Sequence, residues 1–207
     1  LGVAREADVL VLEDQPYRDL RFEGADLPTL SGMAREQGDP DRVVMVRSFS
    51  KVLGPGLRVA YALGHPTLIT AMVRWQQKIT VCPDTLAQRV VARWLEGGGM
   101  ARQRGHLISM YAPRCQTMLQ ALEERMPEGV SWTRPKGGMF IWLSLSGDLD
   151  TAALWEKGLD AGVAYVPGVH FFLNPRDGRR DLRLNFSFPD PEEIRRGVGI
   201  LADLFRA

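Results

Sequence analysis

A lysine that follows two serines and precedes a glycine-rich turn is the stretch of this sequence best suited to chemistry. The stretch runs from Ser48 to Arg58 and reads SFSKVLGPGLR. The hydroxyls of Ser48 and Ser50, the amine of Lys51 and the guanidinium of Arg58 are donors that could converge on a small anion. Most short strings of this kind are surface loops with a solvated lysine, so spacing alone leaves that alternative open.

A second group of candidate residues follows the first apolar run of the chain. Residues 8–12 read DVLVL, the pattern of a strand buried on both faces of a parallel sheet, and the run ends at EDQPY. Ligands bind at the carboxyl ends of strands in open α/β sheets, so we expect Asp14 and Tyr17 to face a site. The alternative is that Asp14 caps the turn before Pro16 while Tyr17 only packs.

Two further strands are needed to bring these groups together. Residues 42–47 predict a second buried strand, whose carboxyl end delivers Ser48, Ser50 and Lys51. Residues 58–64 predict a third strand, which returns after the Gly-Pro-Gly turn. Chemistry-bearing residues from two strand ends are therefore expected at one edge of a sheet.

Helical patterns occupy the middle of the chain. From Pro66, apolar residues recur at a spacing that predicts one buried helix face, and a second helix is expected over residues 84–96. Three glycines at 97–99 are the best candidate for a hinge or boundary, and a long helix over 100–126 follows. The face of the first helix consists of Leu68, Ile69, Met72, Val73 and Trp75.

The remainder predicts a compact α+β unit. Alternating or apolar runs predict strands, and amphipathic runs predict two helices. Asp190 is expected to cap the final helix, with Pro191 in its first turn and acidic residues near its amino end. The expected strands are residues 130–134, 139–145, 163–166 and 182–187, and the expected helices are residues 151–161 and 192–206.

Composition narrows the class of protein. The chain has 207 residues, 45% of them hydrophobic and 25% charged, which is typical of a globular protein with a real core. A formal charge of +1 gives no reason to expect nucleic acid, and no apolar run approaches the ~20 residues of a membrane span. Cys82 and Cys115 are isolated and the three histidines are scattered, so we expect no metal site and a reducing, cytoplasmic setting.

Four strings occur in an order and spacing that closely resemble the carboxy-terminal half of the class I/II aminotransferases. The class I/II aminotransferases are fold-type I pyridoxal-phosphate enzymes, and the sequence most resembles their 2-aminoadipate and kynurenine aminotransferase branch. The likeness covers essentially all 207 residues. The strings are EDQPY at 13–17, the stretch 48–58, PKGGMFIW at 135–142 and LRLNFS at 182–187.

The resemblance implies an α/β fold in two parts. Residues 1–99 would form part of the large, cofactor-binding domain, a mostly parallel sheet with helices, without its amino-terminal half. Residues 100–207 would form the α+β small domain. The absence of an initial methionine and the helix-like start at Leu1 also lead us to expect a fragment.

The resemblance also implies roles for the catalytic candidates. Lys51 corresponds to the lysine that forms a Schiff base with pyridoxal 5'-phosphate and moves the proton at the substrate α-carbon. Asp14 corresponds to the carboxylate beside the pyridine nitrogen, which makes the ring an electron sink. Tyr17 corresponds to the phenol that hydrogen-bonds the 3-oxygen of the ring.

Binding roles follow in the same way. Ser48, Ser50 and Arg58 correspond to the phosphate cradle, so the implied cofactor-binding set comprises these three residues together with Asp14, Tyr17 and Lys51. Arg183 corresponds to the arginine that clamps the substrate α-carboxylate, a task that suits a planar bidentate group.

The implied function is transfer of an amino group between an amino acid and a 2-oxo acid, in amino acid metabolism, by a homodimer when full length. Family members are about twice this length, and their first half completes the site, so we expect the 207 residues alone to be inactive. One alternative is a pyridoxal-phosphate-binding effector domain of a winged-helix transcriptional regulator, which alone would involve nucleic acid. Another is a related lyase or acyltransferase.

Overall fold

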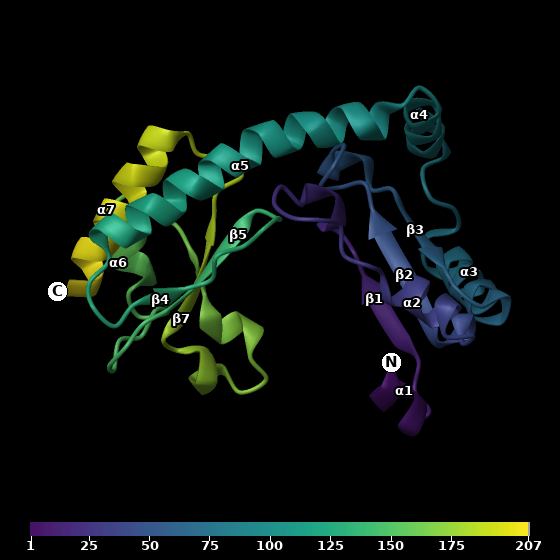
Figure 1. The fold of residues 1–207 in the computed structure, drawn as a ribbon, viewed down its shortest axis with the longest axis horizontal. Helices are drawn as coiled ribbons and strands as arrows, with labels where there is room; N and C mark the ends of the chain where they lie inside the picture. Colours follow the sequence, from purple (N-terminus) through teal and green to yellow (C-terminus); the bar gives the residue numbers. More distant parts are fainter. Residues whose placement is uncertain (207) are drawn as a thin grey trace. The chain divides into compact units, whose positions relative to one another are not determined.

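The computed structural model describes residues 1–206. The chain forms two compact units, of which the first comprises Leu1–Leu107 and the second begins at Ile108 (Figure 1). The division falls within the long helix α5 (Gly99–Arg125), some residues beyond the three glycines. The assignment of residues 1–99 to a large domain and 100–207 to a small domain stays a prediction.

The first unit contains a three-stranded sheet in the order β1-β2-β3. Strands β1 and β2 are parallel, with Asp14 opposite Val46, whereas β3 is antiparallel to β2, with Ala60 opposite Ser48 (Figure 1). The carboxyl ends of β1 and β2 therefore lie side by side, as the sequence predicts. The strands are β1 (Val11–Asp14), β2 (Val43–Ser48) and β3 (Ala60–Leu63).

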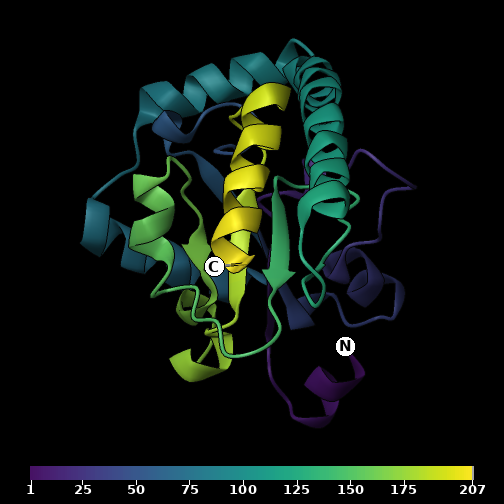
Figure 2. The same ribbon diagram turned by 90° about the vertical axis from the view of Figure 1, so that its left-hand side faces the viewer.

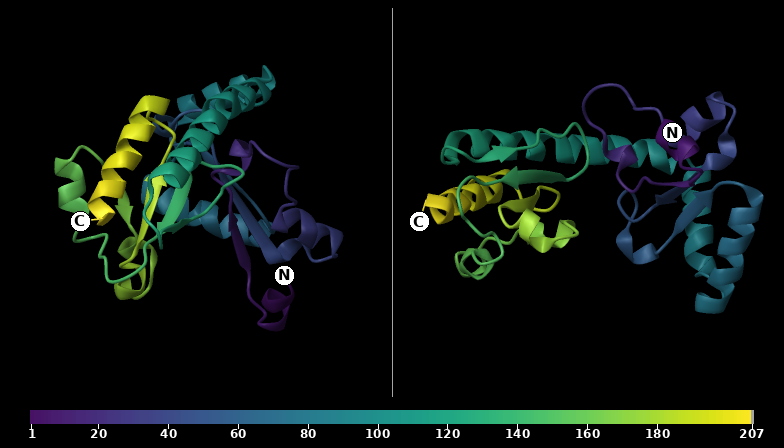
Figure 3. Two further views of the ribbon diagram at one scale, coloured as in Figure 1. Left: turned by 60° about the vertical axis from the view of Figure 1, so that its left-hand side comes forward. Right: turned by 90° about the horizontal axis from the view of Figure 1, so that it is seen from below.

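One α-helix, α2 (Leu30–Glu36), lies between β1 and β2 in the sequence, and the other α-helices of this unit lie before β1 or after β3. Helix α2 packs against the sheet at β2 (Figure 3), and Ala34 of the helix and Val43 of the strand are both buried. Short 3-10 turns lie at the strand ends, and Leu20 in the first of them is almost fully buried. The α-helices are α1 (Gly2–Glu6), α2 (Leu30–Glu36), α3 (Pro66–Thr80) and α4 (Thr85–Glu96), and the 3-10 turns are η1 (Arg18–Leu20), η2 (Pro40–Arg42) and η3 (Pro55–Leu57).

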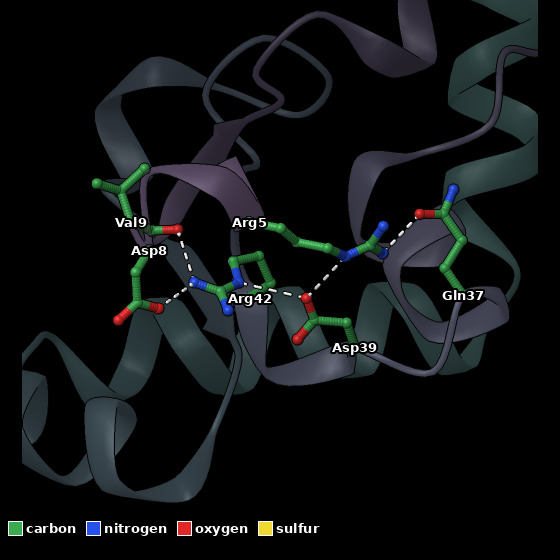
Figure 4. A network of polar contacts seen from close by, with 6 residues as sticks. All are labelled: Arg5, Asp8, Val9, Gln37, Asp39 and Arg42. Atoms are coloured by element: carbon green, nitrogen blue, oxygen red, sulfur yellow. Dashed lines mark hydrogen bonds and ion pairs between the residues drawn. The ribbon is translucent and has the colours of Figure 1, made fainter. Parts of the chain in front are cut away.

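A network of hydrogen bonds and ion pairs joins the amino-terminal ends of β1 and β2 (Figure 4). Arg42 donates to the Asp8 carboxylate at 3.0 Å and to the Val9 carbonyl at 3.2 Å, and its Nε lies 3.3 Å from Asp39. Arg5 reaches the same Asp39 carboxylate at 3.2 Å. Because both strands are tied where they begin, the register of β1 against β2 is supported up to their carboxyl ends.

Two burial predictions for the first unit are wrong. Residues 8–12 were expected to be buried on both faces, but Leu12 is 67% exposed and burial alternates along β1. Helix α3 has no buried residue, and its Trp75 is 64% exposed. The apolar pattern identifies surfaces that gain free energy when covered. It does not say what covers them, and residues 1–206 leave these surfaces open.

The second unit contains a four-stranded antiparallel sheet in the order β4-β5-β7-β6. Side chains alternate across it: Ile141 and Leu182 are fully buried on one face, whereas Trp142 and Arg183, which lie opposite each other in the register, occupy the other. The strands are β4 (Ser131–Trp132), β5 (Phe140–Ser144), β6 (Val166–Pro167) and β7 (Asp181–Asn185).

Helices α5 and α7 cover the apolar face of this sheet (Figure 2). Asp190 caps α7 as predicted, because its carboxylate accepts hydrogen bonds from the N–H groups of Glu192 and Glu193, each at 2.9 Å. No helix in residues 1–206 is long and apolar enough to span a bilayer. The remaining elements are α6 (Trp155–Asp160), α7 (Pro191–Arg206), η4 (Gly168–Phe171) and η5 (Pro175–Gly178).

Candidate functional site

The serines and the arginine of the stretch 48–58 form one hydrogen-bonded cluster. The Ser48 hydroxyl donates to the Ser50 hydroxyl at 2.9 Å, and the Ser50 backbone N–H donates to the Ser48 oxygen at 3.1 Å. Arg58 Nη1 lies 3.4 Å from the Ser50 hydroxyl and 3.2 Å from the Pro55 carbonyl. Two hydroxyls and a guanidinium therefore converge, as the sequence predicts.

Buried apolar residues hold this cluster in place. Phe49 lies between the two serines and Val52 follows Lys51, and these two side chains are 6% and 3% exposed. The chain makes one tight turn around the Phe49 carbonyl, which accepts from the Leu53 N–H at 2.8 Å. With Phe49 and Val52 directed into the core, Ser48, Ser50 and Lys51 remain at the surface of the turn.

Arg58 has an unusual backbone conformation. Its φ of 53° lies in the left-handed region, which residues other than glycine seldom adopt. Such conformations cost free energy and persist where the surrounding structure maintains them, often at binding sites. Here the conformation ends η3 and lets the guanidinium reach back to Ser50.

Tyr17 and Lys51 approach each other from neighbouring strand ends. The Lys51 amine lies 5.9 Å from the centroid of the Tyr17 ring, within the range of a cation–π contact. Tyr17 follows β1, and Lys51 follows β2. The parallel pairing of β1 and β2 thus unites two of the sequence-predicted catalytic residues.

Asp14 is the last residue of β1 and lies at the same sheet edge. It is exposed, and the ladder continues one residue further, because the Gln15 N–H donates to the Val46 carbonyl at 2.9 Å. Its carboxylate is accessible to a ligand that approaches this edge. The alternation of a strand directs the neighbouring Glu13 to the opposite face.

Glu13 is a structural residue that the sequence analysis did not single out. Its two carboxylate oxygens accept from the backbone N–H groups of Leu30, at 2.7 Å, and Ser31, at 3.0 Å, at the start of α2. Partial desolvation raises the pKa of Glu13, but these two hydrogen bonds, together with those from the Gln15 and Ser31 side chains, outweigh it, so the pKa is lowered from 4.5. The only sequence signal is an acid that could bind a helix amino end, and its partner is 17 residues away.

We expect Glu13→Gln to lower the free energy of unfolding by about 1 kcal/mol at neutral pH, because glutamine removes the charge that strengthens the two hydrogen bonds. The effect stays small because the site is partly exposed to solvent. Because the pKa of Glu13 is lower in the folded than in the unfolded protein, its ionised carboxylate stabilises the fold at pH values above the unfolded pKa. This stabilisation is lost as the pH falls through the folded pKa. Denaturant titrations at several pH values measure the difference. It should shrink as the pH falls below 4.5. A difference independent of pH would contradict this role.

Arg183 belongs to the second unit, on the polar face of its sheet. Its guanidinium carbon lies 4.0 Å from the Phe140 ring centroid and 4.9 Å from that of Phe171. The Nε atom is buried and has no hydrogen-bond partner in the part of the chain that the structure describes. A guanidinium with unused donors is suited to a bidentate carboxylate.

The donors of the first unit fit a phosphate group. Two hydroxyls, a guanidinium and a nearby amine match the charge and hydrogen-bonding capacity of a phosphate dianion. A Cβ added at Gly54 or at Gly56 would meet no atom within 4 Å, so the turn leaves open space beside the cluster. An exposed carboxylate at Asp14 suits a cationic ring nitrogen. The residues present therefore fit pyridoxal phosphate.

The chain is similar to known proteins in both sequence and structure. The family model described as aminotransferase class I and II matches residues 1–201. An aromatic-amino-acid aminotransferase of Thermococcus litoralis is 37% identical over 100% of this chain and 48% of its own length. A 2-aminoadipate transaminase of Thermus thermophilus is 40% identical over 96% of this chain and 49% of its own length.

Solved structures give the same result. The crystal structure of a multiple substrate aminotransferase from Thermococcus profundus matches with a TM-score of 0.93 and 40% identity, over 99% of this chain and 50% of that one. The fold is thus that of the fold-type I aminotransferases, and the chain spans about half the length of the relatives it matches. An uncharacterized HTH-type transcriptional regulator of Bacillus subtilis, YdfD, is 24% identical.

Proposed function

Because the chain belongs to the class I and II aminotransferases, we propose that the protein carrying it transfers an amino group between an amino acid and a 2-oxo acid, with pyridoxal phosphate as cofactor. The observation that supports this most directly is the convergence of Ser48, Ser50 and Arg58 beside Lys51, whose amine lies 5.9 Å from the Tyr17 ring centroid. A phosphate cradle next to an amine provides binding and chemistry in one place.

The cradle binds by charge and direction. The Ser48 and Ser50 hydroxyls donate to phosphate oxygens once an anion displaces their mutual hydrogen bond of 2.9 Å. Arg58 neutralises the charge and offers parallel N–H donors. Since the backbone turn holds all three residues in advance, little conformational entropy is lost on binding.

Lys51, Tyr17 and Asp14 act on protons. Pyridoxal phosphate, when bound, supplies a conjugated ring that accepts the electron pair left at the substrate α-carbon. Lys51 Nζ would take the proton from that carbon and deliver it to the cofactor carbon that bears the amino group. Asp14 would hold a proton on the ring nitrogen through its charge, and the Tyr17 hydroxyl would donate to the 3-oxygen of the ring.

Arg183 is proposed to bind the α-carboxylate, which amino acids and 2-oxo acids share. The names of the two relatives include aromatic amino acids and 2-aminoadipate. We include both as candidate donors. The donor screen below therefore offers amino acids with both kinds of side chain.

A homodimer in the cytoplasm completes the proposal. Exposed apolar side chains on β1, β3 and α3, among them Leu12, Leu63 and Trp75, favour burial against the rest of the protein and a partner subunit. Neither Cys82 nor Cys115 forms a disulfide within residues 1–206, which suits a reducing compartment.

The test is a donor screen with the whole protein. L-phenylalanine, L-2-aminoadipate, L-leucine and L-glutamate are offered with 2-oxoglutarate or, for glutamate, phenylpyruvate, while the absorbance of the cofactor is followed. We expect the cofactor spectrum to change with at least one donor and the new amino acid to appear. The chain of 207 residues alone should be inactive. A whole protein that binds the cofactor and transfers no amino group would refute the proposal.

The second candidate is the effector domain of a winged-helix regulator, which the match to YdfD favours. Its identity of 24% is well below that of the two aminotransferases, so we place it second. A regulator would bind promoter DNA through a segment outside this chain and respond to pyridoxal phosphate. Gel-shift experiments with the region upstream of the gene distinguish the two functions.

A further inference from the structure

Aromatic side chains gather around Arg183 on the polar face of the four-stranded sheet. Phe140 and Trp142 project from β5 on this face, and Phe171 comes from η4. The guanidinium carbon of Arg183 lies 4.0 Å from one phenyl centroid and 4.9 Å from the other. Two elements far apart in the sequence therefore contribute rings to one cation.

This arrangement restricts the guanidinium. Stacking on aromatic faces fixes the plane of an arginine fork and leaves its edge free for hydrogen bonds. The Nε of Arg183 is already removed from solvent and has no partner within residues 1–206. The donors are thus oriented before a ligand arrives, and a preorganised group loses less entropy on binding.

Trp142 supports one of the two rings. Its indole meets the Phe171 ring edge-on, with centroids 5.2 Å apart and an interplanar angle of 84°. Its Nε1 donates to the Asp181 carboxylate at 3.3 Å. The same carboxylate accepts from the Ser144 hydroxyl. Asp181 lies two residues before Arg183 on the same strand face. Its Oδ1 atom therefore accepts hydrogen bonds from two neutral donors.

We propose that Phe140 and Phe171 are positioning residues, which hold the Arg183 guanidinium in the plane that binds the α-carboxylate, and that Trp142 keeps Phe171 in place. The inference rests on the proposed function, in which Arg183 binds that carboxylate. Phe140 and Phe171 act through Arg183 and need no contact with the substrate.

The test compares donors with and without an α-carboxylate in the whole protein. The pairs are L-phenylalanine with 2-phenylethylamine and L-leucine with 3-methylbutylamine, and the rate of cofactor conversion is measured. For Phe171→Ala and for Phe140→Ala we expect kcat/KM for the amino acid to fall about threefold to thirtyfold, mainly through KM. The rate with the amine should stay within about twofold, because the amine makes no use of Arg183.

Matched variants separate positioning from packing. Phe171→Trp keeps an aromatic face and should retain most of the activity, whereas Phe171→Leu keeps apolar volume only and should resemble Phe171→Ala. Phe172→Ala removes the neighbouring ring, whose centroid lies 6.2 Å from that of Trp142, and should have little effect. Equal losses with amino acids and amines, or full activity of Phe171→Leu, would overturn the inference. A wild-type protein that converts none of the four amino acids of the donor screen refutes the proposed function instead.

Discussion

Lys51→Ala in the whole protein is expected to lower the rate of amino-group transfer by at least about 10³-fold, since positioned proton transfer alone contributes about 10²–10⁴-fold. Alanine removes the amine that lies 5.9 Å from the Tyr17 ring centroid and leaves the buried Phe49 and Val52 unchanged. The fold and the phosphate cradle should therefore survive. Stopped-flow measurement of cofactor conversion gives the rate, and equilibrium dialysis gives the retention of pyridoxal phosphate.

Two controls make this result specific to Lys51. Lys78→Ala removes a lysine that lies 5.0 Å from the Trp75 ring centroid, a similar contact elsewhere in the same unit, and should leave the rate unchanged. Added methylamine should restore part of the activity of Lys51→Ala, because a soluble amine can carry the missing proton. Turnover of Lys51→Ala at the wild-type rate would exclude a catalytic role for this lysine.

Arg183→Leu is expected to lower kcat/KM for amino acids by about 10²-fold or more. A bidentate carboxylate makes two hydrogen bonds to a charged group, each worth about 1.5–3 kcal/mol, and each 1.4 kcal/mol corresponds to a factor of ten. We expect kcat/KM to fall chiefly for amino acids and 2-oxo acids. A donor without an α-carboxylate has no group that this guanidinium could bind, so its kcat/KM should change little. Steady-state kinetics with both classes of donor measure it.

The neighbouring arginine provides the control for Arg183. Arg179 is also in the second unit, but its Nε lies 3.1 Å from the Asp150 carboxylate and its side chain is half exposed. Arg179→Leu should therefore change kcat/KM by less than about threefold, the scale of an exposed ion pair. Equal losses for Arg179→Leu and Arg183→Leu would mean that net charge, and not a specific clamp, is responsible.

Much of the candidate site could be predicted because its residues are local in the chain. Ser48, Ser50 and Arg58 lie within one turn after β2, so a single stretch of sequence both contains them and brings them together. Tyr17 required one more step, the parallel pairing of two apolar runs, which a short strand pattern predicts. The cap of α7 could also be predicted, because Asp190 directly precedes this helix in the sequence.

Other features could not be read from the sequence. Glu13 binds the start of α2 through residues 17 and 18 positions away, so nothing near it in the chain identifies its partner. Phe140 and Phe171 meet on Arg183 because β5, β7 and η4 pack together. The apolar residues of α3 predict a buried face, but α3 has no buried residue, because burial of a face depends on what packs against it.

The sequence by itself determined the chemical groups, their order and the local turns that present them. Periodicity and residue type are properties of short segments, so the stretch 48–58 could be proposed as an anion site before its contacts were known. Tertiary structure alone decided that Lys51 lies over Tyr17, that Glu13 binds the start of α2, and that two rings enclose Arg183. These contacts join distant segments, and only packing of the whole unit makes them favourable.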